Sequence, residues 1–244
     1  SAASDVYKRQ TFPMNSMYCY LYNTRASYFK NENLRLAFAY AIDRKKILQT
    51  ISAKTYVSLY EERRVVINPP TYNLSRALQY YKIAIETLPC RPAPVRVIYL
   101  DSPTRRHIIQ LLCEQWTSLF GIEFHLDPLP WNQLIARMLQ GDFDIGGLIW
   151  QSSFSELIYM LFSVTEELLP FTNWEKEEYS EILRLIKRYG SSAPLLMQKA
   201  IEILEKYIPI VPIFSLNYVG FSKREVCNSF HKHPCNFRYF SVAN

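Results

Sequence analysis

Apolar residues recur along the chain with two different spacings, which predict where helices and strands form. Leu34, Phe38 and Ala41 repeat at the spacing of one helix face, whereas Phe124 and Leu126 alternate with polar residues as in a half-buried strand. The same spacings predict helices over 34–42, 74–88, 105–120, 131–140, 155–162, 174–189 and 194–207, and a short helix after residue 43. They predict strands over 17–24, 95–100, 122–126, 143–150 and 210–214.

The order of the elements between residues 95 and 150 indicates the fold class. Strand, helix, strand, helix and strand follow one another there with short connections, an order typical of an α/β layer around a largely parallel or mixed sheet. The segment 143–150 is almost wholly apolar, which favours a central position in that sheet. Pro212 restricts the last strand to an edge or a bulge, because proline cannot donate a ladder hydrogen bond.

Residues suited to helix termini precede several of the predicted helices. Asn31 or Asn33 is suited to cap the helix over 34–42, because a short polar side chain can accept from the first free backbone amides. The sequence Thr-Asn-Trp-Glu at 172–175 has the spacing of a capping box. This spacing predicts that a helix begins there.

Composition narrows the class of protein without naming a function. Of the 244 residues, 49% are apolar and 20% are charged, which is typical of an ordered globular chain with a substantial core. The net charge is +6, but lysines and arginines occur only in short, dispersed runs, so nucleic-acid binding is not predicted. No apolar run reaches the roughly 20 residues of a membrane span. Residues 1–16 are interpreted as a tail or an appended segment without a secretory signal.

Residues with chemically active side chains form no recognised catalytic motif. Asp142 and Asp144 lie two residues apart, and on a strand they share one face, an arrangement that acid–base chemistry uses. No Gly-x-Ser-x-Gly or His-Glu-x-x-His sequence is present, and a chain with only six glycines is not expected to form a phosphate-binding loop. We therefore expect no enzymatic activity and no cofactor.

A cluster of cysteines and histidines near the end of the chain has several interpretations. Cys227, His231, His233 and Cys235 lie within nine residues. Two thiols and two imidazoles suit zinc or another soft metal, but their spacing departs from that of the usual paired ligands. A disulfide between the two cysteines, or plain surface positions, agrees better with the spacing. No metal site is predicted.

Three stretches of the chain have an order and spacing that point to a family. The first is Tyr-Asn-Thr at 22–24 followed by Asn-Leu-Arg-Leu-Ala-Phe-Ala-Tyr-Ala-Ile-Asp-Arg at 33–44. The second, over 116–150, has Gly-Ile after a helix and then Gly-Asp-Phe-Asp before an apolar strand that ends in Trp. The third is the helix pair over 174–208 that closes on Ile-Pro-Ile-Val-Pro-Ile. Together they resemble the family 5 extracellular solute-binding proteins, the peptide- and nickel-binding group.

The resemblance implies a particular fold and domain arrangement. It implies a lobe of the type II periplasmic-binding-protein kind, with a mixed sheet flanked by helices. Residues 17–208 then correspond to the second, C-terminal ligand-binding lobe, and residues 209–244 to the return strand into the first lobe and a C-terminal tail. The N-terminal lobe is absent from the sequence, so the chain is interpreted as a fragment.

The resemblance also implies a function. It implies the substrate-binding component of an ABC importer, which captures peptides in a cleft between two lobes and delivers them to a membrane permease. The location is then periplasmic, or the extracytoplasmic face of the cell membrane, with any lipid anchor lying outside this chain. Two alternatives are the solute-sensing domain of a bacterial transcription regulator and a nickel- or metal-chelate-binding protein of the same family.

The first group of candidate ligand-binding residues comes from the resemblance. The cleft is expected at the end of the apolar strand and in the turn after it, at Trp150, Gln151, Ser152, Ser153 and Phe154. Oligopeptide-binding members often have Asp at the position of Ser153, where it pairs with the amino terminus of the peptide. A hydroxyl cannot supply that charge pairing, so amine capture by this residue is in doubt. A core position at the strand end is the alternative for Trp150.

A second group of candidates lies where the first strand ends. Tyr22, Asn23 and Arg25 line the cleft in one interpretation. In the other, Asn23 caps a turn and Arg25 is solvated. The resemblance makes Asp142 and Asp144 structural residues, with the first in a turn and the second hydrogen-bonded near the sheet.

Overall fold

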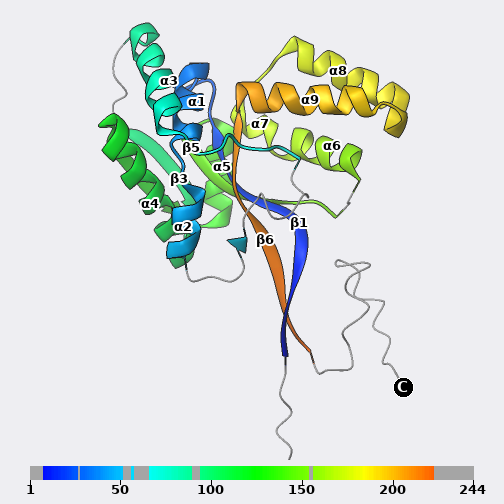
Figure 1. Ribbon diagram of the computed structural model, residues 1–244, viewed down its shortest axis with the longest axis horizontal. Helices are drawn as coiled ribbons and strands as arrows, with labels where there is room; N and C mark the ends of the chain where they lie inside the picture. The colour runs from blue at the N-terminus through cyan, green and yellow to red at the C-terminus, as the bar shows by residue number, and fades with distance from the viewer. Residues whose placement is uncertain are drawn as a thin grey trace, which may run out of the picture.

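The computed structural model describes residues 8–26, 28–51, 56–57, 66–89, 94–153 and 156–222 (Figure 1). The strands are β1 (Lys8–Tyr22), β2 (Tyr56–Val57), β3 (Val95–Leu100), β4 (Phe124–Leu129), β5 (Ile145–Gln151) and β6 (Ile210–Ser222). The helices are α1 (Glu32–Tyr40), α2 (Arg44–Thr50), α3 (Leu74–Thr87), α4 (Pro103–Phe120), α5 (Trp131–Gln140), α6 (Leu157–Glu167), α7 (Leu169–Thr172), α8 (Glu177–Tyr189) and α9 (Pro194–Tyr207), with a 3-10 turn at Gly190–Ser192.

The described strands form one six-stranded mixed sheet. Its order is β2-β6-β1-β5-β3-β4. The strands β5, β3 and β4 are parallel to one another, whereas β1 is antiparallel to both of its neighbours, β5 and β6. The predicted α/β class with a mixed sheet is therefore confirmed, and β5 lies inside the sheet, as its apolar sequence indicated.

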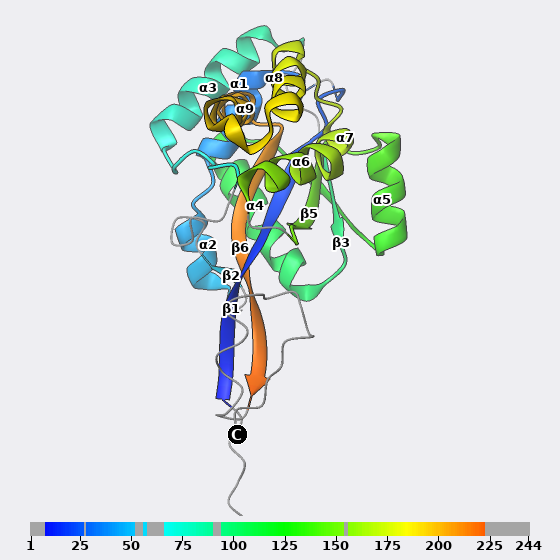
Figure 2. The ribbon, with the colours of Figure 1, turned by 90° about the vertical axis from the view of Figure 1, so that its right-hand side faces the viewer.

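Helices cover both faces of the sheet, and each face has its own core. Alternate residues of β1 point to opposite sides, so Tyr18 and Tyr20 pack with α1 to α4, while Met17 and Cys19 pack with α5, α6, α8 and α9. All four residues are almost completely buried. Figure 2 shows α2 and α3 to one side of the strands and α5 to the other. Because β1 is buried on both faces, its apolar pattern does not alternate.

The strand β1 is longer than the predicted strand over 17–24, and it forms a ribbon with β6. Residues 8–13 pair with residues 217–222 in an antiparallel ladder that runs out from the helical layers (Figures 1 and 2). The register shifts between Pro13 and Met17, where β1 contains extra residues. Residues 8–16 are thus part of the sheet and do not merely precede it.

The last strand accommodates its proline in the way that the sequence predicted. Tyr18 pairs with Phe214, but the next residue, Cys19, pairs with Pro212, so β6 has an extra residue at this point. The residue without a partner in β1 is Ile213, so the ladder is interrupted directly next to the proline, which has no amide to donate. The strand β2 pairs only with Ser215 and Leu216, so at Pro212 the only neighbour of β6 among the described strands is β1, and the bulge and the unpaired side both accommodate the proline.

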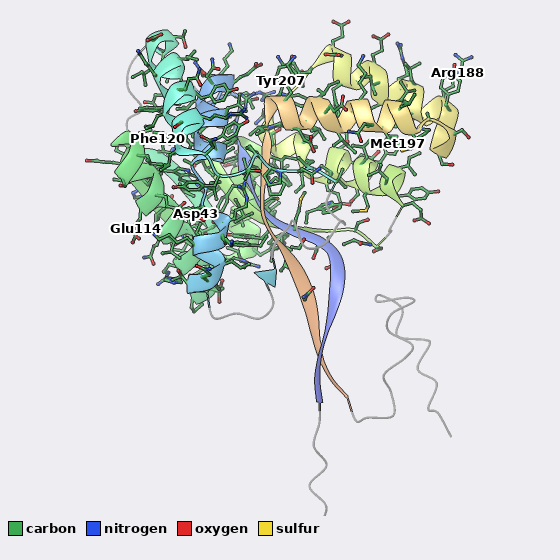
Figure 3. All side chains as sticks on the ribbon, in the orientation of Figure 1. Asp43, Glu114, Phe120, Arg188, Met197 and Tyr207 are labelled. Carbon is green, nitrogen blue, oxygen red and sulfur yellow. The ribbon has the colours of Figure 1, made fainter. Side chains whose placement is uncertain are left out.

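Two buried arginines connect early helices to late parts of the chain. Arg35 in α1 is 1% exposed and donates to the carbonyl oxygens of Tyr207 at 2.9 Å and of Phe29 at 2.6 Å. Arg44 in α2 is 7% exposed and donates to the carbonyl oxygen of Pro212 at 3.0 Å. Figure 3 shows Tyr207 at the end of α9 that lies toward α1. A buried guanidinium requires such acceptors, and here they fasten α9 and β6 to the first two helices.

One predicted helix start is wrong, and the reason is local. The helix α8 begins at Glu177 and not at the predicted capping box, and its N-cap residue, Lys176, makes no side-chain cap. Thr172 instead ends the short helix α7, where its hydroxyl donates to the carbonyl oxygen of Leu169 at 2.7 Å and accepts from the amide of Trp174 at 3.2 Å. The same side chain cannot also cap the next helix. By contrast, Asn31 caps α1 as predicted.

Candidate functional site

The two groups of predicted ligand-binding residues lie at opposite ends of the sheet. Ser16 of β1 pairs with Gln151, and Tyr22 pairs with Ile145. Six residues along an extended strand span about 20 Å. We use the term carboxyl edge for the end of the sheet where the parallel strands β3, β4 and β5 finish, and amino edge for the end where they begin. Trp150 belongs to the first edge and Tyr22 to the second, so the structure does not bring the two groups together.

At the amino edge, Asn23 uses its whole hydrogen-bonding capacity within the protein. Its amide nitrogen donates to the carbonyl oxygens of Gly141 and Phe143, both at 2.9 Å. Its side-chain oxygen accepts from the backbone amide of Arg25 at 3.1 Å and from the side chain of Asn173 at 3.2 Å. An asparagine has two donors and two acceptor positions, and all four are occupied. Asn23 therefore caps a turn, as the second interpretation predicted.

The two other candidates of this group, Tyr22 and Arg25, differ in exposure. Tyr22 is 1% exposed, and its ring stacks on Phe29 with 4.8 Å between the ring centroids. Burial raises the pKa of the Tyr22 hydroxyl far above its ordinary value. Arg25 is exposed to solvent. Contact of these residues with a ligand stays a prediction, and their position at the amino edge separates them from the other candidates.

The two aspartates at the amino edge belong to an ion-pair network. Asp144 is 8% exposed and accepts from the backbone amide of Arg96 at 2.8 Å. Asp142 pairs with the guanidinium groups of Arg96 and Arg137, the second at 3.0 Å. Burial raises the pKa of Asp144. Burial also acts to raise the pKa of Asp142, but the bonds and charges of the two arginines outweigh it and hold that pKa below its ordinary value.

At the carboxyl edge, the first group of candidates is divided between the core and the surface. Trp150 is 2% exposed, and its indole nitrogen donates to the hydroxyl of Ser163 at 2.9 Å, which places it in the core as the alternative interpretation stated. Ser152 is buried, and its backbone amide donates to the carbonyl oxygen of Asn15 at 2.8 Å. Gln151 and Ser153 are exposed. Phe154 lies outside the described residues.

The carboxyl edge also contains exposed aromatic side chains that the sequence did not indicate as ligand-binding candidates. In open α/β sheets, ligands bind outside the carboxyl ends of the strands. Trp131 is the first residue of α5, directly after β4 and Pro130, and it is 56% exposed. Tyr159 in the first turn of α6 is 52% exposed. A tryptophan placed just after a strand end was the available signal, because a helix start beyond a parallel strand always lies at this edge.

The ribbon of β1 and β6 leaves the lobe from this same edge. Gln151 pairs with Ser16, and residues 8–13 continue past the end of β5. The shift in register between Pro13 and Met17 therefore lies beside the exposed end of β5. Figure 2 shows the ribbon extending away from the helical layers on this side. Anything attached through the ribbon approaches the carboxyl edge and not the amino edge.

Two further structural features concern membranes and metals. None of the helices within the described part of the chain is both long and apolar enough to cross a bilayer. Among the described residues, no three His, Cys, Asp or Glu side chains lie together as a metal ion requires. The weak metal candidates Cys227, His231, His233 and Cys235 lie outside the described residues.

Comparison with known sequences decides the family. A sequence profile for the bacterial extracellular solute-binding proteins, family 5, middle region, matches residues 2–166. The chain belongs to this family. The match extends from β1 into α6, so it includes β1 to β5 and the ends of the parallel strands at the carboxyl edge.

Two curated relatives of this family 5 chain come from Bacillus subtilis (strain 168). The oligopeptide-binding protein OppA is 23% identical over 224 residues, which cover 83% of this chain and 40% of the relative. The dipeptide-binding protein DppE is 22% identical over 241 residues, which cover 91% of this chain and 44% of the relative. The family 5 chain therefore spans less than half the length of the curated relatives that it matches.

Solved structures show the same fold as this family 5 chain. The murein tripeptide binding protein MppA of Escherichia coli has a TM-score of 0.75 at 18% identity, with 89% of this chain and 45% of that chain covered. The pheromone receptor PrgZ has a TM-score of 0.73 at 19% identity, with 90% and 46% covered. The fold is that of a type II periplasmic peptide-binding protein, and the family 5 chain forms a part of that fold.

Proposed function

We propose that this chain is a ligand-binding lobe of the substrate-binding component of an ABC importer for peptides. The observation that carries the proposal is the arrangement of the carboxyl edge, where the ribbon of β1 and β6 leaves the lobe beside the exposed end of β5, at Gln151 and Ser153, and the exposed Trp131 follows β4 farther along the same edge. The relatives are named as an oligopeptide-binding, a dipeptide-binding and a murein tripeptide binding protein. These names support peptide as the ligand class. The complete protein then holds the peptide between this edge and a second lobe.

The exposed groups at the carboxyl edge suit a peptide ligand of variable sequence. Trp131 and Tyr159 offer large, stiff rings to the side chains of a ligand. Gln151 and Ser153 have polar groups for the backbone of a peptide, directly or through water, since a bridging water costs little enthalpy. Ser153 has no charge, so an ammonium group at this point gains a hydrogen bond but no ion pair.

The ribbon of β1 and β6 is the proposed hinge between this lobe and the second lobe. A two-stranded connection with a shift in register at its base can bend while its ladder stays paired. Bending at this point closes the second lobe over the carboxyl edge, and the closed form is the one that delivers the peptide to a membrane permease. Such a component works on the periplasmic or extracytoplasmic side of the membrane.

The test uses the full-length protein that contains this lobe. Mass spectrometry of small molecules that co-purify with the protein should recover peptides, and calorimetry with the recovered peptides should give saturable binding. The variant Trp131→Ala should weaken binding at least about tenfold, because a central aromatic contact is lost. The matched control is Tyr189→Ala, which removes a similarly exposed ring (54%) at the end of α8. A folded protein that yields no peptide and binds none contradicts the proposal.

A further inference from the structure

The free end of the α8–α9 pair presents two apolar side chains to solvent. Tyr189 is the last residue of α8, and Leu195 is the second residue of α9, beyond the turn Gly190–Ser192. Their exposed fractions are 54% and 83%, and no other large hydrophobic residue in the described part of the chain is as exposed as Leu195. Single exposed apolar residues are common in proteins, so the surroundings of these two decide whether they have a role.

Leu195 occupies a position where helix stability favours a different kind of residue. The first turn of a helix has unbonded amide groups and partial positive charge, so Asp or Glu stabilises it. The first turn of α9 contains Pro194, Leu195 and Leu196, with no acidic residue and no side-chain cap. Leu196 packs against the core, whereas Leu195 does not. The lobe itself therefore gains nothing from an apolar side chain at residue 195.

Lysine and arginine are the only charged residues in the sequence around this turn. Residues 182–201 include four of them and neither Asp nor Glu. Lys187 and Arg188 lie in the last turn of α8, where the helix dipole favours cations. The guanidinium of Arg188 lies 5.7 Å from the centroid of the Tyr189 ring. The dipole explains the cations, but it does not explain the exposed apolar groups beside them.

The present partners of these four cations hold them only weakly. Arg184, Lys187 and Lys199 lie 3.2, 4.0 and 3.7 Å from a carboxylate oxygen. Every side chain in these three pairs is more than half exposed. Exposed pairs contribute little stability, so their cations remain available to another anion. Arg188 has no acidic partner within the described chain.

We use the term tip for residues 187–195, which protrude from the lobe. Figure 3 shows Arg188 and Met197 at this end of the α8–α9 pair and Tyr207 at the opposite end. Figure 1 shows the tip at the right of the view and the ribbon of β1 and β6 at the bottom. A protruding leucine needs a matching pocket in a protein partner, whereas the fluid surface of a membrane adapts to its shape. Cations beside that leucine suit a surface of anionic lipids.

We propose that the tip binds the surface of a membrane that contains anionic phospholipids. Leu195 enters the boundary between head groups and acyl chains, and the ring of Tyr189 lies among the head groups. Lys187 and Arg188 contact lipid phosphate groups. The contact stays at the surface, because the other apolar faces of α8 and α9 belong to the core. This inference does not depend on peptide binding, and it adds a membrane contact to the proposed function.

The experiment measures sedimentation of the full-length protein, prepared without attached lipid, with sucrose-loaded vesicles. One set of vesicles is phosphatidylcholine alone, and in the other about one third of the lipid is phosphatidylglycerol, which adds negative charge. The protein should bind the anionic vesicles at least about tenfold more strongly, and sodium chloride should weaken this binding because salt screens exposed charges. Equal binding to both sets, or no binding to either, overturns the inference.

Variants of Leu195 test the apolar part of the tip. Leu195→Gln should lower the partition coefficient for anionic vesicles by about tenfold, because less apolar surface leaves water on binding. The matched control is Leu139→Gln, which changes a leucine that is 69% exposed on α5. Leu195→Trp should strengthen binding, since tryptophan favours the membrane interface, and loss of folding cannot produce such a gain. Equal effects of Leu195→Gln and Leu139→Gln place the contact elsewhere and overturn the inference.

A double variant tests the charged part of the tip. Lys187→Gln combined with Arg188→Gln should weaken binding to anionic vesicles by about fivefold for each cation removed. The control is Lys45→Gln combined with Lys46→Gln, an exposed basic pair on α2. Circular dichroism and thermal unfolding establish that each variant is folded. Equal losses in the two double variants mean that net charge alone governs binding, which overturns the role of the tip.

The outcomes are separable from those of the proposed function. Peptide binding, measured by calorimetry, should be the same in wild type and in every tip variant, because the tip lies apart from the ribbon and the carboxyl edge. A protein that binds peptide but no vesicles overturns this inference and leaves the proposed function intact. Binding of the tip to an acidic protein, without binding to vesicles, also overturns the inference, because the partner is then not a membrane.

Discussion

The two edges of the sheet differ in how their polar residues are bonded. At the amino edge, Asn23 and Asp144 are buried, and their polar groups bond within the protein. At the carboxyl edge, Gln151 and Ser153 are exposed, and the guanidinium of Arg105 has no bonding partner among the described residues. Saturated groups fix the positions of loops, whereas unsaturated groups are available to a ligand. The contrast supports the proposal that the amino edge is structural and that the carboxyl edge binds the ligand.

The first prediction uses two tryptophans of the carboxyl edge that differ in burial. Trp150→Ala should lower the free energy of unfolding by about 3–5 kcal/mol, because it leaves a cavity in the core and a hydroxyl without its donor. Trp131→Ala should change it by less than about 0.5 kcal/mol. Urea unfolding curves of the two variants measure the difference. Equal losses of stability place Trp131 in the core and remove it from the candidate site.

The second prediction compares the two edges directly. Asn23→Ala should lower the free energy of unfolding by about 3 kcal/mol, because four hydrogen bonds and their buried partners are affected. Ser153→Ala should lower it by less than about 0.5 kcal/mol. Chemical denaturation with both variants in parallel checks this. If Asn23→Ala leaves the free energy of unfolding unchanged and Ser153→Ala lowers it, the assignment of the two edges is reversed.

The third and smallest prediction concerns acid stability at the amino edge. Asp142 has a pKa below its ordinary value in the folded protein, so its charged form stabilises the fold above that ordinary value of about 3.9. The stabilisation is lost as pH falls through the folded pKa. Wild type should therefore exceed Asp142→Asn in stability at pH 7 by less than about 1 kcal/mol, since the pair is half exposed.

The measurement for Asp142 is thermal unfolding at pH 7 and at pH 3. The difference between wild type and Asp142→Asn should shrink at the lower pH. Gln151→Ala serves as a control without a titratable group. A difference that stays the same at both pH values means that the carboxylate charge does not contribute.

Local signals in the sequence predicted the elements of the parallel half of the sheet well. The bounds Val95–Leu100 of β3 and Trp131–Gln140 of α5 agree with the prediction to the residue. Apolar spacing and terminal residues act within a few positions of each other, so they can be read without the rest of the fold. The predicted capping box at Thr172 was wrong, because the hydroxyl of this residue bonds within the short helix α7 and is not available to cap α8.

The arrangement of the candidate site was harder to predict because it depends on pairing between distant segments. The direction of β1 relative to β5 decides that Tyr22 and Trp150 lie at opposite edges, and no local pattern encodes that direction. Burial of Trp150 likewise depends on α6, which packs over it. Trp131 was passed over because its exposure is a property of the folded lobe. Family resemblance supplied the fold, and only the structure separated the core residues from the exposed ones.

The pairing of β1 with β6 has a consequence for how the chain is made. Lys8 pairs with Ser222, so β1, which is synthesised before the other described strands, must wait for β6, the last of them, before its ladder is complete. Contacts between such distant residues form slowly. Until then, β1 presents an unpaired edge of apolar residues, which is a site for aggregation. A chain halted before β6 is synthesised should therefore depend on chaperones, however stable the finished lobe is.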